Sequence, residues 1–226
     1  MSRGRRISRV KFIPPSKQTA EKYLREWESR ILHYTPEAFP NLTAQNLFGQ
    51  AGLFSLDIGC GTGEYLNAQA AANPEHLFVG VEISRRAIYY AVNQAAARQL
   101  KNILYLKADF KLLYPLFSPD SLEDVYLIFP DPNYGGAKKL KNRIFKPDFL
   151  DRMAFALSRD GKIEVVTDQE PFLYDMLEIA EGDPRFTKPH EARFLQDFSP
   201  PEKTRFQVAW EKFNRPVFRF QLKRAS

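Results

Sequence analysis

The sequence contains one cysteine, three histidines and no long apolar run, although 44% of its 226 residues are hydrophobic. The lone cysteine, Cys60, excludes an internal disulfide and any cysteine-rich metal site. No apolar stretch has the length needed to span a membrane, and no signal-peptide core follows Met1. These absences favour a cytoplasmic protein without a membrane or metal partner. The apolar content is sufficient for one sizeable hydrophobic core.

Positive charge is concentrated at the start of the chain. Residues 1–30 contain nine Lys or Arg residues and three Glu residues, so their net charge of +6 equals that of the whole chain. Residues 31–226 are therefore balanced. We expect a basic arm over residues 1–16, followed by a single domain over residues 17–226. Such arms often contact nucleic acid, but a solvated, unstructured terminus has the same composition.

Short apolar runs recur through the middle of the chain. Bounded by polar and turn-forming residues, they are typical of buried strands. Five of them predict strands over residues 53–58, 77–83, 103–106, 125–129 and 162–166. Helical segments separate the runs, which implies right-handed βαβ units. We therefore predict an α/β fold with a doubly wound, mostly parallel sheet. These five strands and a C-terminal pair, described next, give seven strands in total.

Helical periodicity and C-terminal alternation complete the secondary-structure prediction. Two alternating aromatic runs, residues 204–210 and 216–222, predict a β-hairpin that would add an antiparallel edge to the sheet. Ser84 is a good N-cap for the helix that follows the second strand. Outside the glycine-rich region, helices are predicted over residues 16–34, 84–98, 148–157 and 169–181.

A glycine-rich turn follows the first predicted strand. Gly59, Gly61 and Gly63 lie directly after this strand and before a helical segment. Glycines permit a sharp turn and the close approach of a ligand, and the helix N-terminus offers unpaired N–H groups. A dinucleotide fingerprint needs its third glycine one position later, where this chain has Glu64. The spacing looks more like motif I of the S-adenosylmethionine (SAM) methyltransferases, and a glycine turn without a ligand is the alternative.

Four carboxylates lie at or just beyond the C-terminal ends of successive predicted strands: Asp57, Glu82, Asp109 and Asp131. Ligands of open α/β sheets bind at this edge. Glu82 has a spacing suited to binding ribose hydroxyls, Asp109 can accept from an adenine amine, and Asp57 can face an ammonium group. SAM presents all three groups. Each acid alone could be a loop cap or a solvated carboxylate, but four at one edge favour a binding site.

The sequence F-P-D-P at residues 129–132, the basic loop that follows and Thr167-Asp168 resemble the tRNA (guanine-N7)-methyltransferase family, over about residues 53–210. The resemblance implies a class I SAM-dependent methyltransferase that transfers the SAM methyl group to N7 of a guanine in the tRNA variable loop. It also implies functional residues of three kinds: Asp131 as the catalytic residue; Asp57, Gly59, Gly61, Gly63, Glu82, Asp109 and Asp131 for the cofactor; and Lys138, Lys139, Asp168, Thr204 and Gln207 for the substrate.

Two positions depart from the family pattern. Asn133 follows F-P-D-P where the family usually has Trp, and Gln207 stands where the family has Glu. Guanine N7 carries a free lone pair, so positioning the reactants suffices and no strong base is needed. Two alternatives stay open: a SAM- or RNA-binding relative without catalysis, and a methyltransferase that acts on another RNA or a small molecule. The sequence is compatible with a monomer or a homodimer.

Overall fold

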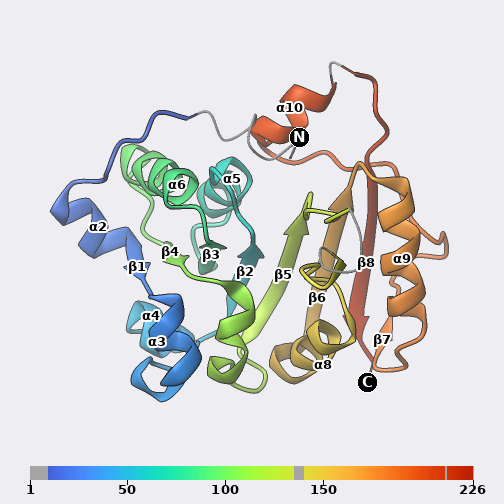
Figure 1. Cartoon of the computed structure of the whole chain (residues 1–226), viewed down its shortest axis with the longest axis horizontal. Coiled ribbons are helices and arrows are strands. Elements are labelled where there is room, and N and C mark those ends of the chain that lie inside the picture. The colour runs from blue at the N-terminus through green and yellow to red at the C-terminus, as the bar shows by residue number, and fades with distance from the viewer. Residues whose placement is uncertain (1–9, 135–139, 212, 226) are drawn as a thin grey trace.

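The computed structural model describes residues 10–134, 140–211 and 213–225 (Figure 1). Within these residues one sheet runs in the order β1-β4-β3-β2-β5-β6-β8-β7, once the strands are numbered along the chain. The strands are β1 (Leu24–Glu26), β2 (Phe54–Ile58), β3 (Phe78–Glu82), β4 (Ile103–Lys107), β5 (Leu122–Ile128), β6 (Leu157–Thr167), β7 (Phe186–Thr187) and β8 (Phe218–Arg224). Strands β1 to β6 are parallel to one another, whereas β8 is antiparallel to both of its neighbours, β6 and β7. The doubly wound, mostly parallel sheet is confirmed. It has eight strands instead of seven, because the unpredicted β1 and β7 form its two edges and residues 204–210 form no strand.

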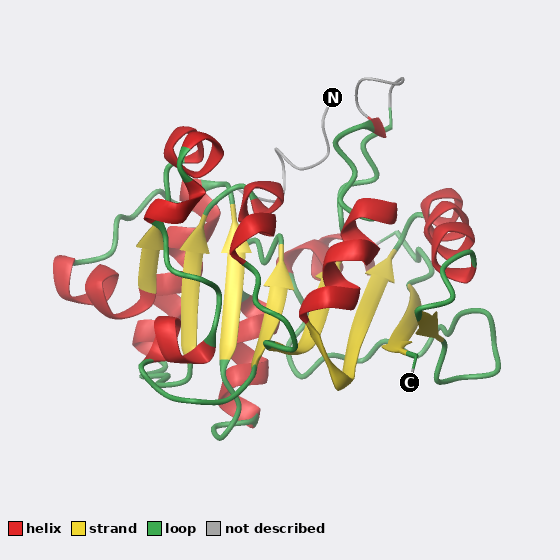
Figure 2. Cartoon of the chain, turned by 90° about the horizontal axis from the view of Figure 1, so that it is seen from below, coloured by secondary structure: helices red, strands yellow, loops and turns green. Residues whose placement is uncertain are grey.

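Helices cover both faces of the sheet (Figure 2). Along β4, Tyr105 packs into the core beneath one set of helices, and its neighbours Leu104 and Leu106 pack into the opposite core. The first set is α2 (Lys17–Tyr23), α5 (Glu64–Ala72) and α6 (Arg85–Ala97). The second is α3 (Ser29–Tyr34), α4 (Ala44–Phe48), α8 (Pro147–Ala156) and α9 (Glu170–Glu181), with the 3₁₀ helices η1 (Pro36–Ala38) and η2 (Phe110–Leu116). No helix in the described ranges has the length and apolar content to cross a bilayer.

The helix predicted over residues 16–34 is wrong in its middle. Strand β1 interrupts it and pairs in parallel with β4, and Trp27 N–H donates to the Lys107 carbonyl at 3.0 Å. Tyr23 packs into one core and Trp27 into the other, although both have helical spacing. The chain therefore crosses the edge of the sheet between these two aromatics and satisfies backbone groups that β4 would otherwise leave unpaired.

The C-terminal hairpin is also wrong, although the antiparallel edge is present. Residues 205–211 form a helix, α10 (Arg205–Glu211), and β8 pairs with β6 and the two-residue β7. Thr204 begins α10, since its hydroxyl oxygen accepts from Gln207 N–H at 3.0 Å and its carbonyl from Val208 N–H at 3.0 Å. The Phe206 ring packs on Phe129 with centroids 4.9 Å apart. This N-cap and aromatic contact override the alternating pattern.

Candidate cofactor and substrate site

The glycine turn, residues 59–63, joins β2 to α5 where the order of the sheet reverses, because β3 lies on one side of β2 and β5 on the other. Gly59 and Gly61 have φ of +74° and +56°. Among the described residues, a Cβ on Gly59 would meet no atom within 4 Å, and one on Gly61 would meet only the Gly59 carbonyl oxygen, at 3.9 Å. These two residues thus present bare backbone to open space, which suits a ligand that lies close to the main chain.

Gly63 has a different role. Its φ is +78°, but a Cβ here would lie 2.6 Å from the Ala91 Cβ and 2.8 Å from the Tyr105 hydroxyl oxygen. The Tyr105 hydroxyl donates to Asn67 Oδ1 at 2.9 Å. Gly63 therefore allows α5 to pack tightly against α6 and the buried Tyr105. The structure supplies a packing reason for this glycine that the sequence pattern did not distinguish from ligand contact.

Glu82, at the end of β3, is hydrogen-bonded to the glycine turn. Its Oε2 accepts from Gly61 N–H at 3.1 Å, and its Oε1 accepts from Ser84 N–H at 2.7 Å. Burial raises the pKa of this carboxyl, while the backbone donors oppose the rise. Two donors therefore fix the position of the carboxylate beside Gly61. The Ser84 N-cap of α6 is confirmed, because its hydroxyl oxygen accepts from Ala87 N–H.

Asp57 is buried in β2 and lies near Glu82. Burial, and secondly the charge of Glu82, raises the pKa of Asp57 to about 8. Within the described residues, no hydrogen bond to its carboxylate offsets this desolvation. The thiol of Cys60, in the same turn, has a pKa raised by burial and by the charges of Asp57 and Glu82. The site thus disfavours the charged form of these acids, and a cationic ligand group beside them would favour it.

Asp109 and Asp131 lie after β4 and β5 and form local turns. Asp109 Oδ1 accepts from Lys111 N–H at 3.1 Å and begins η2. Asp131 is exposed, and its Oδ1 accepts from Asn133 N–H at 2.9 Å. Asn133 has a φ of +50°, a conformation that asparagine tolerates better than the tryptophan of the family pattern. One oxygen of each carboxylate therefore caps a local turn, as the alternative interpretation predicted.

On the substrate side, the structure brings α10 to the F-P-D-P segment through the Phe206–Phe129 contact. The Gln207 side chain is 3% exposed, and its Nε2 donates to Glu211 Oε1 at 3.3 Å. Its Oε1 is buried without a hydrogen-bond partner among the described residues. Asp168, after β6, accepts from Gln169 Nε2 at 2.6 Å. An unpaired buried acceptor is costly, so Gln207 Oε1 is a candidate contact for a substrate N–H group.

The structure describes only part of the basic loop that follows F-P-D-P. Lys138 and Lys139 lie outside the described residues. The Arg143 side chain is only 13% exposed, because it pairs with Asp175 at 2.7 Å and its Nε donates to the Pro132 carbonyl at 2.8 Å. Its guanidinium also lies over the Phe172 ring. Arg143 therefore attaches the loop to α9, so it does not extend toward solvent as a phosphate ligand.

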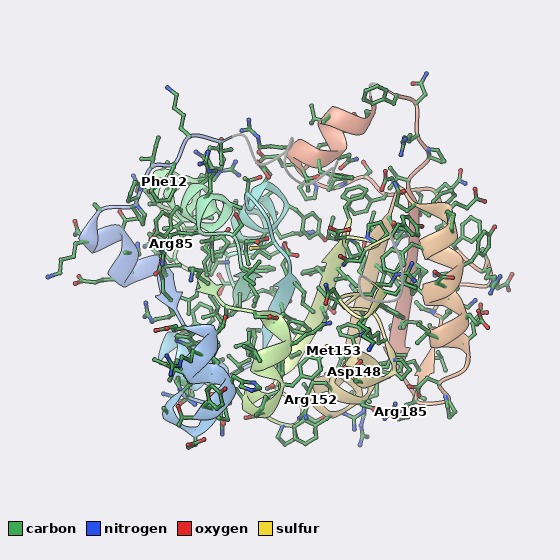
Figure 3. The ribbon with its side chains drawn as sticks, viewed as in Figure 1. Phe12, Arg85, Asp148, Arg152, Met153 and Arg185 are labelled. Carbon is green, nitrogen blue, oxygen red and sulfur yellow. The ribbon has the colours of Figure 1, made fainter. Side chains whose placement is uncertain are left out.

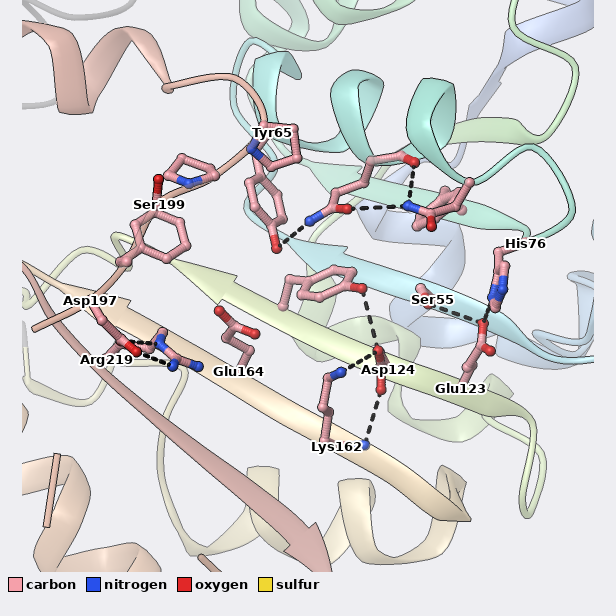
Figure 4. A pocket seen from close by; sticks show the side chains of 17 residues that line it. Ser55, Tyr65, His76, Glu123, Asp124, Lys162, Glu164, Asp197, Ser199 and Arg219 are labelled. Carbon is pink, nitrogen blue, oxygen red and sulfur yellow. Dashed lines mark hydrogen bonds and ion pairs between the residues drawn. The ribbon is translucent and has the colours of Figure 1, made fainter. Parts of the chain in front are cut away.

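A cavity that sequence reasoning missed lies on the part of the sheet formed by β5, β6 and β8 (Figure 4). Its volume is about 450 Å³. Two ion pairs line it, Lys162–Asp124 and Arg219–Asp197, and the imidazole of His76 lies 2.9 Å from Glu123. The only available signal was polar alternation along these strands. The cavity lining includes none of the four carboxylates at the strand ends. Glu164, which also lines it, accepts from Gln221 Nε2 at 3.0 Å.

Comparisons with known proteins agree with this geometry. Residues 51–220 match the model of a protein family described as "Putative methyltransferase". A tRNA (guanine-N(7)-)-methyltransferase of Rubrobacter xylanophilus is 40% identical, covering 97% of this chain and 98% of its own length. A second protein of that name, from Chloroherpeton thalassium, is 34% identical over 97% of each chain.

Solved structures share the fold at lower identity. The crystal structure of the 16S rRNA methyltransferase KamB superposes with a TM-score of 0.61 at 19% identity, covering 80% of this chain and 92% of that one. TrmN from Thermus thermophilus gives a TM-score of 0.53 at 19% identity, covering 87% of this chain and 48% of that one.

Proposed function

This chain belongs to the tRNA (guanine-N7)-methyltransferase family, and we propose that it transfers the methyl group of SAM to N7 of a guanine in the variable loop of tRNA. The observation that carries the proposal is the anchoring of Glu82 at the glycine turn, where Gly59 and Gly61 leave open space. Sequence analysis had predicted that Gly59, Gly61 and Glu82 bind the cofactor.

The residues at the turn fit SAM. Gly59 and Gly61 leave room for a ligand against the backbone. In the bound state Glu82 would accept from the ribose hydroxyls, Asp57 would face the ammonium group, and Asp109 would accept from the adenine amine. When bound, SAM supplies an electrophilic methyl group on a sulfonium centre. Gly63 supports the site indirectly through packing.

The substrate side offers acceptors to the guanine edge. Guanine donates from N1–H and from its N2 amine. We assign Asp131 as their acceptor, through the carboxylate oxygen that does not cap its turn. Gln207 Oε1 and Asp168 are the further acceptors on this side. Thr204 acts indirectly by beginning α10. No proton has to be removed before N7 attacks, so these contacts act by orienting guanine in line with the methyl group.

The proposal extends to partners and organisation. tRNA is the substrate, with Lys138 and Lys139 as phosphate contacts, and the enzyme works in the cytoplasm alongside tRNA. We retain a basic arm over residues 1–16 and one catalytic domain over residues 17–226. The described part of the arm rests on α6, since Val10 is buried and Phe12 stacks on Tyr89 with centroids 5.6 Å apart.

The decisive experiment is nucleoside analysis of tRNA incubated with the protein and methyl-labelled SAM. We expect label in 7-methylguanosine. Label in another nucleoside would refute the assignment to N7, and tight SAM binding without any label would favour the non-catalytic alternative. Asp131→Asn is the matched variant, because asparagine can cap the same turn while presenting a donor to guanine.

A further inference from the structure

Two lysine ammonium groups converge on one backbone carbonyl beside the site. The carbonyl oxygen of Lys141 accepts from Lys111 Nζ at 3.1 Å and also from Lys146 Nζ. Lys111 comes from η2, and Lys146 immediately precedes α8. Three separate points of the chain thus bring two positive charges to a single neutral acceptor.

Within the described chain, carboxylates offset the charge of this lysine pair only at longer range than an ion pair. No carboxylate oxygen there lies within the 4.0 Å of an ion pair from either Nζ. Asp109 and Asp148 are near enough to favour the charged form of Lys111, yet burial and the charge of Lys146 lower its pKa. Like charges held together in this way are relieved when an anion bridges them.

The pair is adjacent to the proposed catalytic site. Lys111 donates its backbone N–H to Asp109, one of the carboxylates assigned to the cofactor. The loop that carries Lys141 is hydrogen-bonded to the F-P-D-P segment, because Arg143 Nε donates to the Pro132 carbonyl. Lys146 also stands at the start of α8, whose first turn adds the positive end of a helix dipole. Figure 3 labels Asp148 and Arg152 on this helix.

We propose that Lys111 and Lys146 together bind a backbone phosphate of the tRNA substrate, close to the nucleotide that is methylated. The proposal rests on the proposed function. A phosphate offers several acceptor oxygens, so both ammonium groups can donate to it at once. Phosphate contacts supply affinity and register without reading the base, which suits a site next to a guanine pocket. Neither lysine belongs to the family motifs that the sequence resembles.

The test is the salt dependence of tRNA binding by the full chain, with Lys111→Ala/Lys146→Ala as the variant. Losing one phosphate contact should lower the slope of log K against log salt by about 0.7 to 0.9 and weaken binding about tenfold at 0.1 M salt. Lys101→Ala/Lys223→Ala removes the same charge from exposed positions near the end of the sheet where the parallel strands begin, away from the proposed site. This variant should leave the slope within error of wild type. Lys111→Arg/Lys146→Arg should restore it.

Folding and function are read out separately. S-adenosylhomocysteine (SAH) affinity should match wild type in the alanine variant. Its melting temperature should not fall, because the substitutions remove repulsion between two like charges. An unchanged slope, or the same loss in both alanine variants, would overturn the proposal. Inorganic phosphate that stabilises wild type but not the variant, with no change in the tRNA slope, would also overturn it in favour of a free-phosphate site. If the protein binds tRNA through this pair but never forms 7-methylguanosine, only the proposed function fails.

Discussion

Binding of SAH, the demethylated product of SAM, should release a proton from Asp57. With a pKa of about 8, Asp57 is protonated in roughly nine-tenths of the free protein at pH 7. The ammonium group of the ligand favours the carboxylate, so complex formation should release close to one proton at pH 7 and about a tenth of one at pH 9. SAH is the better probe, because the sulfonium charge of SAM depresses the pKa of its own amine.

The same protonation weakens binding at low pH. Ionising Asp57 at pH 7 costs about 1.4 kcal/mol for a pKa one unit higher. Affinity should therefore rise about tenfold from pH 6 to pH 7 and level off above pH 8. The sign follows from the raised pKa, because the binding-competent carboxylate form is the minor form below pH 8.

Calorimetry in buffers of different ionisation enthalpy measures the released protons directly. Asp57→Asn should bind SAH more weakly and release only the protons that Glu82 contributes, since the pKa of Glu82 is also raised. The two carboxyls interact, so the wild-type value belongs to the pair. If Asp57→Asn released as many protons as wild type, Asp57 would not be the ammonium partner and the reasoning would fail.

Further predictions concern single residues and the arm. Glu82→Ala should weaken SAH binding at least tenfold, consistent with roughly 1.5–3 kcal/mol for a charged hydrogen-bonding group, and calorimetry against the exposed Glu75→Ala control checks it. Asp131→Asn should melt within a few degrees of wild type and lose most single-turnover tRNA methylation; full activity would leave Asp131 only as a turn cap. Removing residues 1–9, which carry four arginines, should flatten the salt dependence of tRNA binding without changing SAH affinity. Without ligand, Asp57→Asn should raise the melting temperature more at pH 8 than at pH 5, because a raised carboxyl pKa reduces stability between about pH 4 and pH 8.

The positions of the carboxylates could be predicted because they depend on local signals. Glu82 and Asp109 each follow a short apolar run, and parallel strands place their ends at one edge of the sheet. The fold class follows from the same alternation of strands and helices. The path of residues 16–34 could not be predicted, because Tyr23 and Trp27 have helical spacing while they pack on opposite faces of the sheet. Only the unpaired edge of β4 explains why the chain becomes extended between them.

The Lys111–Lys146 pair shows a second limit of sequence reasoning. The two residues are separated by 35 positions, and their meeting depends on where the loop after β5 lies over η2. The basic residues among 133–143 predicted a basic loop, and Arg143 was one of them. In the structure, however, the Arg143 guanidinium lies over the Phe172 ring. Composition can therefore locate charge along a chain, but contacts decide which cations remain available to a polyanion.

Gln207 illustrates how tertiary contacts change the meaning of a departure from a family pattern. A glutamate here would lie one helical turn from Glu211, and two carboxylates at that spacing repel each other. The amide instead donates to Glu211, which also pairs with Lys203 at 2.7 Å. The other end of the amide, Oε1, remains a buried acceptor without a partner in the part of the chain that the structure describes. Recognition of guanine N–H groups requires an acceptor oxygen but no negative charge, so Gln207 keeps the feature that this chemistry needs while neutralising its own surroundings.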